Sequence, residues 1–156
     1  MHTIALRPIT EADLPFLFRV YASTRWEELA PTGWDAAQKE AFLQQQFAAQ
    51  HAWWQEQYQG TSFDVVERAS VPIGRLYVAR WERELRIVDI ALLPEFRGDG
   101  IGTQLIDGVI AEAEAAGLPV RIHVEIFNPA RELYDRLGFV PIEDKGVYLL
   151  MERPPR

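Results

Sequence analysis

The chain has 156 residues, 48% of them hydrophobic and 25% charged, which is the composition of one ordinary globular domain spanning residues 1–156. Its 16 basic and 23 acidic residues leave a formal charge of −7, which disfavours nucleic acid as a partner and mildly favours cationic small molecules. The absence of cysteine excludes disulfides, thiolate metal ligands and a cysteine nucleophile, and the 3 histidines show no metal-ligand spacing.

Membrane and export signals are also missing from the sequence. The longest apolar runs are far too short to span a bilayer, and the N-terminal segment lacks a basic region followed by a long apolar core. We therefore expect a cytoplasmic protein that has no membrane partner.

The first part of the chain predicts one strand and two helices. Residues 3–7 alternate in polarity as a strand does, and a capping pattern introduces a helix with an apolar stripe over residues 14–21. Residues 24–34 contain turn-forming residues and are predicted to be a loop. A longer helix is predicted over residues 35–57, and it carries more aromatic side chains than one buried stripe requires.

The middle of the chain predicts three strands joined by short turns. Residues 62–68, 73–79 and 87–93 are rich in β-branched residues, and their close spacing indicates consecutive antiparallel pairing. The next strand, at residues 120–125, follows a helix, so it is predicted to lie parallel to the strand at 87–93.

The C-terminal part predicts a short helix and a hairpin. Asn128 is predicted to cap a helix that Gly138 ends, and residues 139–142 and 147–151 are predicted to pair. The predicted order is β-α-α-β-β-β-α-β-α-β-β, without internal repeats.

A glycine-rich turn between the strand at 87–93 and the following helix is the most informative segment. Three glycines alternate with larger residues from Arg97 to Gly102, so several unpaired amides face one spot at a helix N-terminus, where phosphate binds well. A dinucleotide fingerprint would need glycine where Thr103 stands, and a P-loop would need a lysine that the segment lacks. Both of these alternatives fail.

Two motifs resemble those of the GCN5-related N-acetyltransferase (GNAT) superfamily. Arg97, Gly100 and Gly102 match Arg-x-x-Gly-x-Gly, which is similar to the pyrophosphate-binding motif of that family. The segment from Asn128 to Gly138-Phe139 resembles its C-terminal signature, in which an asparagine precedes a short helix that carries a tyrosine. The tyrosine follows the asparagine by six positions, whereas seven is more usual in the family.

The resemblance implies a fold and a cosubstrate. The fold is α/β (α+β), a mixed and mostly antiparallel sheet of about seven strands with a central parallel splayed pair, flanked by about four helices. Acetyl-CoA would enter the splay, where a β-bulge within residues 89–92 is expected to free a backbone amide for the oxyanion. The implied acetyl-CoA-binding residues are Ile90, Ala91, Leu92, Arg97, Gly98, Asp99, Gly100, Ile101, Gly102, Thr103 and Asn128.

The implied reaction is direct transfer of an acetyl group to a primary amine of a small molecule, amino acid or peptide, without a metal. Tyr134 matches the family tyrosine that protonates the departing thiolate. Because an alkylamine titrates near pH 10, a base is also needed, and both Asp89 and Glu125 are candidates. Asp89 could equally be the partner of an arginine such as Arg86. His123 is interpreted as a hydrogen-bonded core histidine.

The acceptor side has weaker signals. Acidic residues in a loop would suit an amine, and aromatic rings of the second helix could line a pocket, although solvated charges and sheet packing explain them as well. A non-catalytic acyl-CoA-binding sensor and an unrelated structural or nucleotide-binding module remain open, and pairing through the last strands would give a homodimer. The candidate acceptor-binding residues are Glu27, Glu28, Trp54 and Tyr58.

Overall fold

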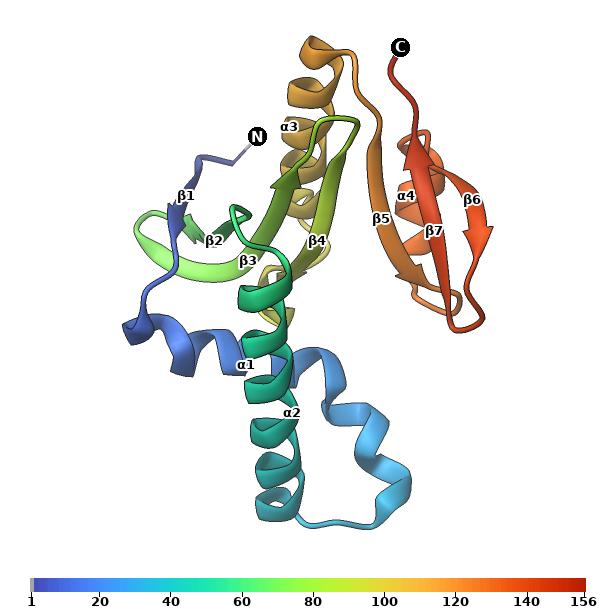
Figure 1. Cartoon of the computed structure of the whole chain (residues 1–156). Helices are drawn as coiled ribbons and strands as arrows, with labels where there is room; N and C mark the ends of the chain where they lie inside the picture. The colour runs from blue at the N-terminus through green and yellow to red at the C-terminus, as the bar shows by residue number, and fades with distance from the viewer. Residues whose placement is uncertain (1) are drawn as a thin grey trace.

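The computed structural model describes residues 2–156 and contains a seven-stranded sheet in the order β1-β2-β3-β4-β5-β7-β6 (Figure 1). Neighbouring strands are antiparallel except for the parallel pair β4–β5, so the predicted fold class and strand order are confirmed. The strands are β1 (Ile4–Pro8), β2 (Ser62–Arg68), β3 (Val71–Arg80), β4 (Leu85–Leu92), β5 (Val120–Glu125), β6 (Val140–Asp144) and β7 (Tyr148–Arg153).

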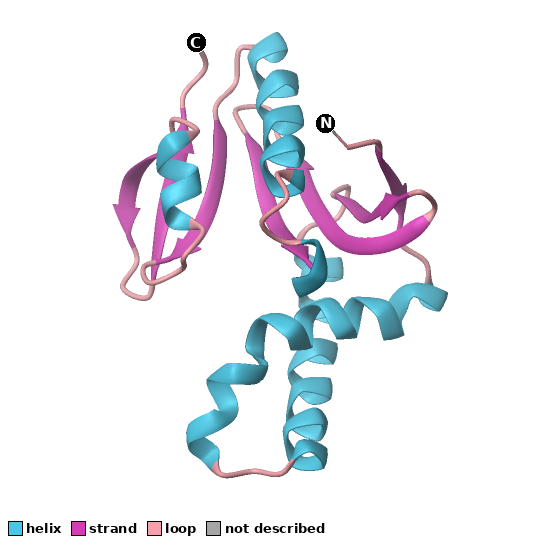
Figure 2. Ribbon diagram, turned by 180° about the vertical axis from the view of Figure 1, so that it is seen from behind, coloured by secondary structure: helices cyan, strands magenta, loops and turns pink. Residues whose placement is uncertain are grey.

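Helices cover both faces of the sheet. α3 and α4 lie on one face, seen from the front in Figure 2, and α1 and α2 lie on the other side, against the first half of the sheet only. The helices are α1 (Leu14–Arg25), α2 (Ala36–Gln57), α3 (Ile101–Ala116) and α4 (Arg131–Arg136), with short 3₁₀ helices η1 (Glu11–Asp13), η2 (Trp26–Thr32) and η3 (Pro94–Phe96).

Two apolar clusters hold these layers together. The larger one joins alternate residues of the central strands to α3, whose apolar stripe includes Leu105, Ile106 and Val109. The smaller cluster joins α1 to α2 through Leu17 and Phe47 among others. The sheet is therefore anchored to α3, and the α1–α2 pair forms a second packed unit beside it.

The parallel pair is short and then opens. β4 and β5 pair only over Leu85–Ile87 and Val120–Ile122, after which β5 stays paired with β7 alone. The ribbons of β4 and β5 diverge below this point in Figure 1. The register of β4 against β3 skips Val88, which is therefore the bulged residue, one position before the segment where the sequence predicts a bulge.

Several details differ from the sequence predictions. The predicted loop at residues 24–34 is wrong, because α1 continues to Arg25 and η2 follows it, ended by Gly33 with a left-handed φ of 72°. α4 begins at Arg131 rather than at residue 129, because the Asn128 side chain accepts the Ala130 amide at 2.8 Å in a turn before the helix. β4 begins at Leu85, two residues earlier than predicted.

Candidate functional site

The glycine-rich turn before α3 has open space around its main chain. Gly98 and Gly100 have φ values of +78° and +83°, which other residues rarely adopt. A Cβ atom added at either glycine, or at Gly102, would meet no protein atom within 4 Å. The main chain of this segment is therefore open to a ligand along its length.

The amides of this turn are also unused. The Arg97 amide donates to the Pro94 carbonyl at 3.2 Å, and the Gln104 amide donates to the Gly100 carbonyl at 3.0 Å. Between them, the amides of residues 98–103 have no acceptor within the part of the chain that the structure describes, residues 2–156. Consecutive free amides at the start of the 16-residue helix α3 suit a diphosphate, and we call residues 98–103 the amide cradle.

Two side chains of the turn are held by contacts within the protein. The Arg97 guanidinium donates to the Leu92 carbonyl at 2.9 Å and to the Ser23 hydroxyl at 3.2 Å, so it ties the cradle to β4 and α1. The Asp99 carboxylate lies 3.4 Å from His2 and 3.5 Å from Arg68. The Arg68 guanidinium offsets a negative charge that would oppose phosphate.

One edge of β4 faces the opening between the splayed strands. The Leu93 amide donates to the Ile73 carbonyl of β3 at 2.9 Å. Because successive amides of a strand point to opposite sides, Ala91 also faces β3, whereas Ile90 turns its N–H and C=O toward β5. Since β5 does not pair there, the main chain of Ile90 is available to a ligand in the opening.

Tyr134 approaches from the α3–α4 face. Its ring is 5% exposed and packs edge-on against Phe139, with centroids 5.6 Å apart. Its hydroxyl has no hydrogen-bond partner among residues 2–156, but protein atoms do not cover it completely. Burial, followed by the charge of Asp89, raises the pKa of this phenol, which therefore stays protonated at neutral pH. A protonated, unpaired hydroxyl can donate a proton.

The two candidate carboxylates are both ion-paired. Asp89 lies 2.6 Å from Nε of Arg75, and not against Arg86, whose partner is Glu84 at 2.8 Å. The expected Arg86 pairing is thus wrong, because Asp89 lies opposite Tyr77 of β3, two residues from Arg75.

Glu125 has its own partner at the open end of the splay. It lies 3.0 Å from Arg25 of α1, which also binds Glu28 at 3.1 Å. Burial lowers the pKa of the Arg25 guanidinium, but the bond to Glu125 and the nearby acidic charges outweigh burial and raise it. Through Arg25, the end of α1 is joined to the end of β5. Asp89 and Glu125 both have partners on the α1–α2 side, opposite Tyr134.

The four candidate acceptor residues do not gather in one place. Trp54 packs on Tyr77, with ring centroids 5.7 Å apart, and also contacts Arg75, so it lies close to Asp89. Tyr58 instead stacks on Trp81 at the end of β3. The two acidic residues, Glu27 and Glu28, are exposed on η2.

Sequence reasoning missed Arg75 and misplaced His123. Arg75 interrupts an otherwise apolar strand, and this interruption was the available signal. His123 is exposed rather than in the core, because Ile122 and Val124 take the inward positions of β5. Partial desolvation of its ring, followed by the nearby Arg86 charge, lowers the pKa of His123.

A surface pocket of about 470 Å³ between α4 and the last hairpin, lined by Ile126, Arg131 and Ile142 among others, contains none of the predicted site residues. Within residues 2–156, no group of three or more acidic or histidine side chains is arranged to hold a metal ion. No described helix combines the length and apolarity needed to cross a bilayer.

Comparison with known proteins identifies the family. The model of the acetyltransferase (GNAT) family matches residues 23–139, which is most of the chain. The chain belongs to this family. The resemblance inferred from the two sequence motifs is thereby confirmed.

Solved structures share this GNAT fold at low sequence identity. PaiA N-acetyltransferase from Thermoplasma acidophilum, in complex with coenzyme A, is 18% identical with a TM-score of 0.72 over 97% of this chain and 99% of that one. Ribosomal-protein-S18-alanine N-acetyltransferase from Escherichia coli is 17% identical, with a TM-score of 0.64 over 97% and 94%. Histone acetyltransferase HPA2 and related acetyltransferase from Corynebacterium glutamicum is 23% identical, with a TM-score of 0.67 over 99% and 97%. No curated protein matches the sequence significantly.

Proposed function

We propose that this GNAT protein transfers an acetyl group from acetyl-CoA to a primary amine of a small molecule, amino acid or peptide. The amide cradle supports this proposal most directly, because its free N–H groups and glycines suit the diphosphate of coenzyme A. One similar structure contains coenzyme A, and two carry N-acetyltransferase in their names.

The residues fit acetyl-CoA along the opening between β4 and β5. The cradle would hold the pyrophosphate, and the main chain of Ile90 would hold the pantetheine arm in place of the missing β5 partner. The Ala91 and Leu92 main chains are less available, because Ala91 faces β3 and the Leu92 carbonyl is bound to Arg97. Asn128 uses its side-chain oxygen in the turn before α4. The cosubstrate supplies an activated acetyl thioester.

The two proposed proton transfers involve side chains on opposite faces of the sheet. Asp89, or Glu125 beyond it, would take the ammonium proton directly or through water, since an alkylammonium cannot act as a nucleophile. As the new C–N bond forms and the C–S bond breaks, the nitrogen would release its second proton to solvent, while Tyr134 would give its proton to the sulfur and regain one from solvent. The protonated state of its buried phenol supports this role.

The proposal is tested by measuring free thiol released from acetyl-CoA in the presence of a panel of primary amines. We expect release that depends on both the protein and the amine, together with an acetylated product detected by mass spectrometry. Binding of ATP or NAD in preference to CoA would contradict the proposal.

A non-catalytic acyl-CoA sensor is the second candidate function, because a cradle alone is sufficient for binding. It predicts tight acetyl-CoA binding without thiol release for any amine. The unpaired hydroxyl of Tyr134, close enough to Asp89 for its charge to raise the pKa of the phenol, favours the enzyme, since a sensor has no use for a proton donor.

Cellular location and assembly remain predictions from the sequence. We expect a cytoplasmic protein that can pair through its last strands as a homodimer. Cell fractionation measures the first expectation, and light scattering coupled to size-exclusion chromatography measures the second.

A further inference from the structure

Arg75 is a buried cation on β3, the strand that pairs with β4 where β4 borders the opening. The residue is 4% exposed, and its Nε donates to Asp89 at 2.6 Å. The centre of its guanidinium lies 5.4 Å from the Trp54 ring and 5.3 Å from the Tyr77 ring. One carboxylate and two aromatic rings thus hold the planar group firmly in one orientation.

Most of the hydrogen-bonding capacity of this guanidinium is unused. Its terminal nitrogens have no acceptor among residues 2–156, although a guanidinium carries four N–H donors on them. These terminal nitrogens are not completely covered by protein atoms, so a bound group can reach them. The adjacent Tyr77 hydroxyl is fully buried and makes no well-aligned hydrogen bond among these described residues; burial raises the pKa of its phenol, and the neighbouring Arg75 guanidinium offsets part of that rise. Buried donors without partners are rare in native proteins and indicate a ligand or bound water.

The register places these groups on the acceptor side of the sheet. Arg75 lies opposite Ala91, and Tyr77 lies opposite Asp89, so the side chains share the face that α2 crosses. Asp89 follows the bulge at Val88, where β4 leaves β5, and only one of its oxygens is bound by Arg75. A free carboxylate oxygen and a free guanidinium edge therefore lie together beside the splay.

Resting on the proposed acetyl transfer, we propose that Arg75 selects acceptors whose amine stands on a carbon next to a carbonyl or carboxylate group. The ammonium binds the free oxygen of Asp89, and the neighbouring oxygen accepts from the terminal nitrogens of Arg75. A free α-amino acid and the N-terminal residue of a peptide both present this chemistry. A simple alkylamine leaves the donors unpaired and is therefore the poorer acceptor.

The experiment compares four acceptors of matched shape by thiol release from acetyl-CoA. Alanine carries a carboxylate, alaninamide and trialanine carry an amide carbonyl, and isopropylamine carries a methyl group instead. Because the α-amines of alaninamide and trialanine titrate near pH 8, whereas those of alanine and isopropylamine titrate near pH 10, kcat/KM is expressed per unprotonated amine. We expect the oxygen-bearing acceptors to exceed isopropylamine by roughly 10-fold or more. Alanine and trialanine then distinguish a free amino acid from a peptide.

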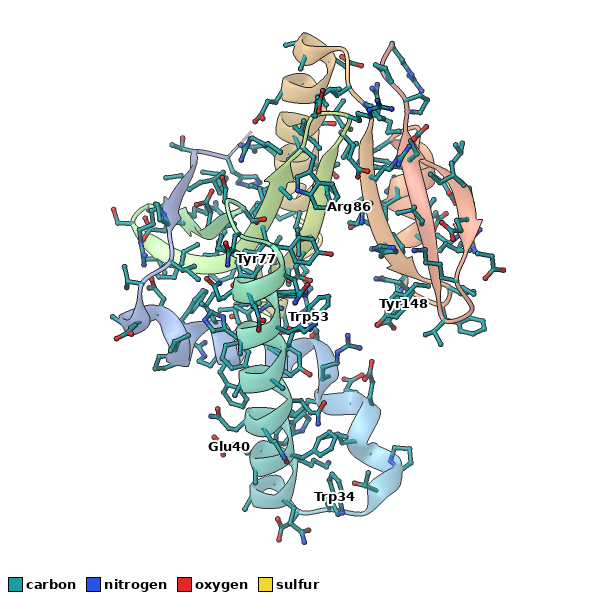
Figure 3. The ribbon with its side chains drawn as sticks, in the orientation of Figure 1. Trp34, Glu40, Trp53, Tyr77, Arg86 and Tyr148 are labelled. Carbon is teal, nitrogen blue, oxygen red and sulfur yellow. The ribbon has the colours of Figure 1, made fainter. Side chains whose placement is uncertain are left out.

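Two variants assign this preference to the guanidinium. Arg75→Lys keeps the charge beside Asp89 but loses the planar fork, so it should lower kcat/KM for the oxygen-bearing acceptors roughly 10-fold more than for isopropylamine. Arg75→Gln should remove the preference completely. Arg86→Gln is the matched control, because Arg86 also pairs with a carboxylate and lies 5.0 Å over a tryptophan ring, but at the closed end of the splay (Figure 3).

Each outcome of these measurements supports or contradicts the role proposed for Arg75. Equal losses for all four acceptors in Arg75→Lys would mean that Arg75 only positions Asp89, and would overturn the proposal. A wild-type preference for isopropylamine would overturn it without any variant, while leaving acetyl transfer intact. Absence of thiol release with every amine would overturn the proposed function itself. An unchanged CoA affinity, measured by calorimetry, shows that each variant is folded.

Discussion

The two halves of the candidate site are built in different ways. The amide cradle is a single stretch of exposed main chain whose side chains are absent or turned aside. The acceptor side is built from side chains of two strands and a helix, namely buried Arg75 and Tyr77 and half-buried Asp89 and Trp54. A main-chain site depends on local backbone geometry, whereas a side-chain site depends on the packing of the whole domain. The two halves should therefore fail independently when they are mutated.

Gly100→Glu should have the largest effect. The residue has φ of +83° and open space around it, so a carboxylate there would project where the diphosphate is proposed to bind. We expect CoA affinity to fall more than about 100-fold in calorimetry, since one removed or repelled charge contact costs several kcal/mol. Gly117→Glu is the control, with φ of +69° at the opposite end of α3. If both variants bound CoA equally well, the cofactor would have to bind outside the amide cradle.

Asp89→Asn should spare the cradle and damage the acceptor side. The amide keeps the shape of the side chain but cannot take a proton, so kcat/KM for amines should fall roughly 100-fold while CoA affinity is retained. Removing one charge of a buried pair also costs about 3 kcal/mol of stability, which a thermal melt detects. Glu125→Gln is the comparison variant. A larger loss of activity in Glu125→Gln than in Asp89→Asn would assign the base to Glu125.

Tyr134→Phe should lower kcat by roughly 10-fold to 100-fold without changing CoA affinity. Burial raises the pKa of this phenol above its ordinary value near 10, so the protonated form persists to higher pH than in a free tyrosine. The wild-type kcat should therefore show no loss from phenol ionisation between pH 7 and about 10, a range that contains the ordinary titration of tyrosine. Weakened CoA binding with a normal kcat would assign Tyr134 to the cofactor instead.

The difference in construction also decides how much of the site the sequence could predict. The cradle was predictable, because glycines at 98, 100 and 102 between an apolar strand and an amphipathic helix describe the geometry locally. The fold was predictable for the same reason, since periodicity and turn residues are local signals. The Arg75–Asp89 pair was not, because it requires the β3–β4 register and the bulge at Val88, which no local pattern specifies. The α1–β5 bridge through Arg25 joins residues 100 positions apart.

Gly102→Ala separates folding from binding within the cradle. A methyl group there meets no protein atom within 4 Å, and alanine favours the first turn of α3, so the variant should be about 0.5 kcal/mol more stable. The same methyl would crowd a diphosphate that lies against the main chain, so CoA affinity should fall several-fold. A thermal melt and calorimetry measure the two effects. Tighter CoA binding would show that the ligand does not contact residue 102.

The β2–β3 turn shows that main-chain geometry can also escape sequence reasoning. Ala69 and Ser70 form a two-residue hairpin loop with φ of 51° and 65°, although this left-handed turn favours Asn-Gly. Replacing both residues, Ala69→Asn with Ser70→Gly, should relieve the strain, raising stability by about 1 kcal/mol and the Tm by about 2–4 °C. CoA affinity and amine turnover should not change, because the turn contributes nothing to either half of the proposed site. An unchanged or lower Tm would mean that the wild-type loop is not strained, and left-handed geometry at Ala69 and Ser70 would then cost the fold nothing.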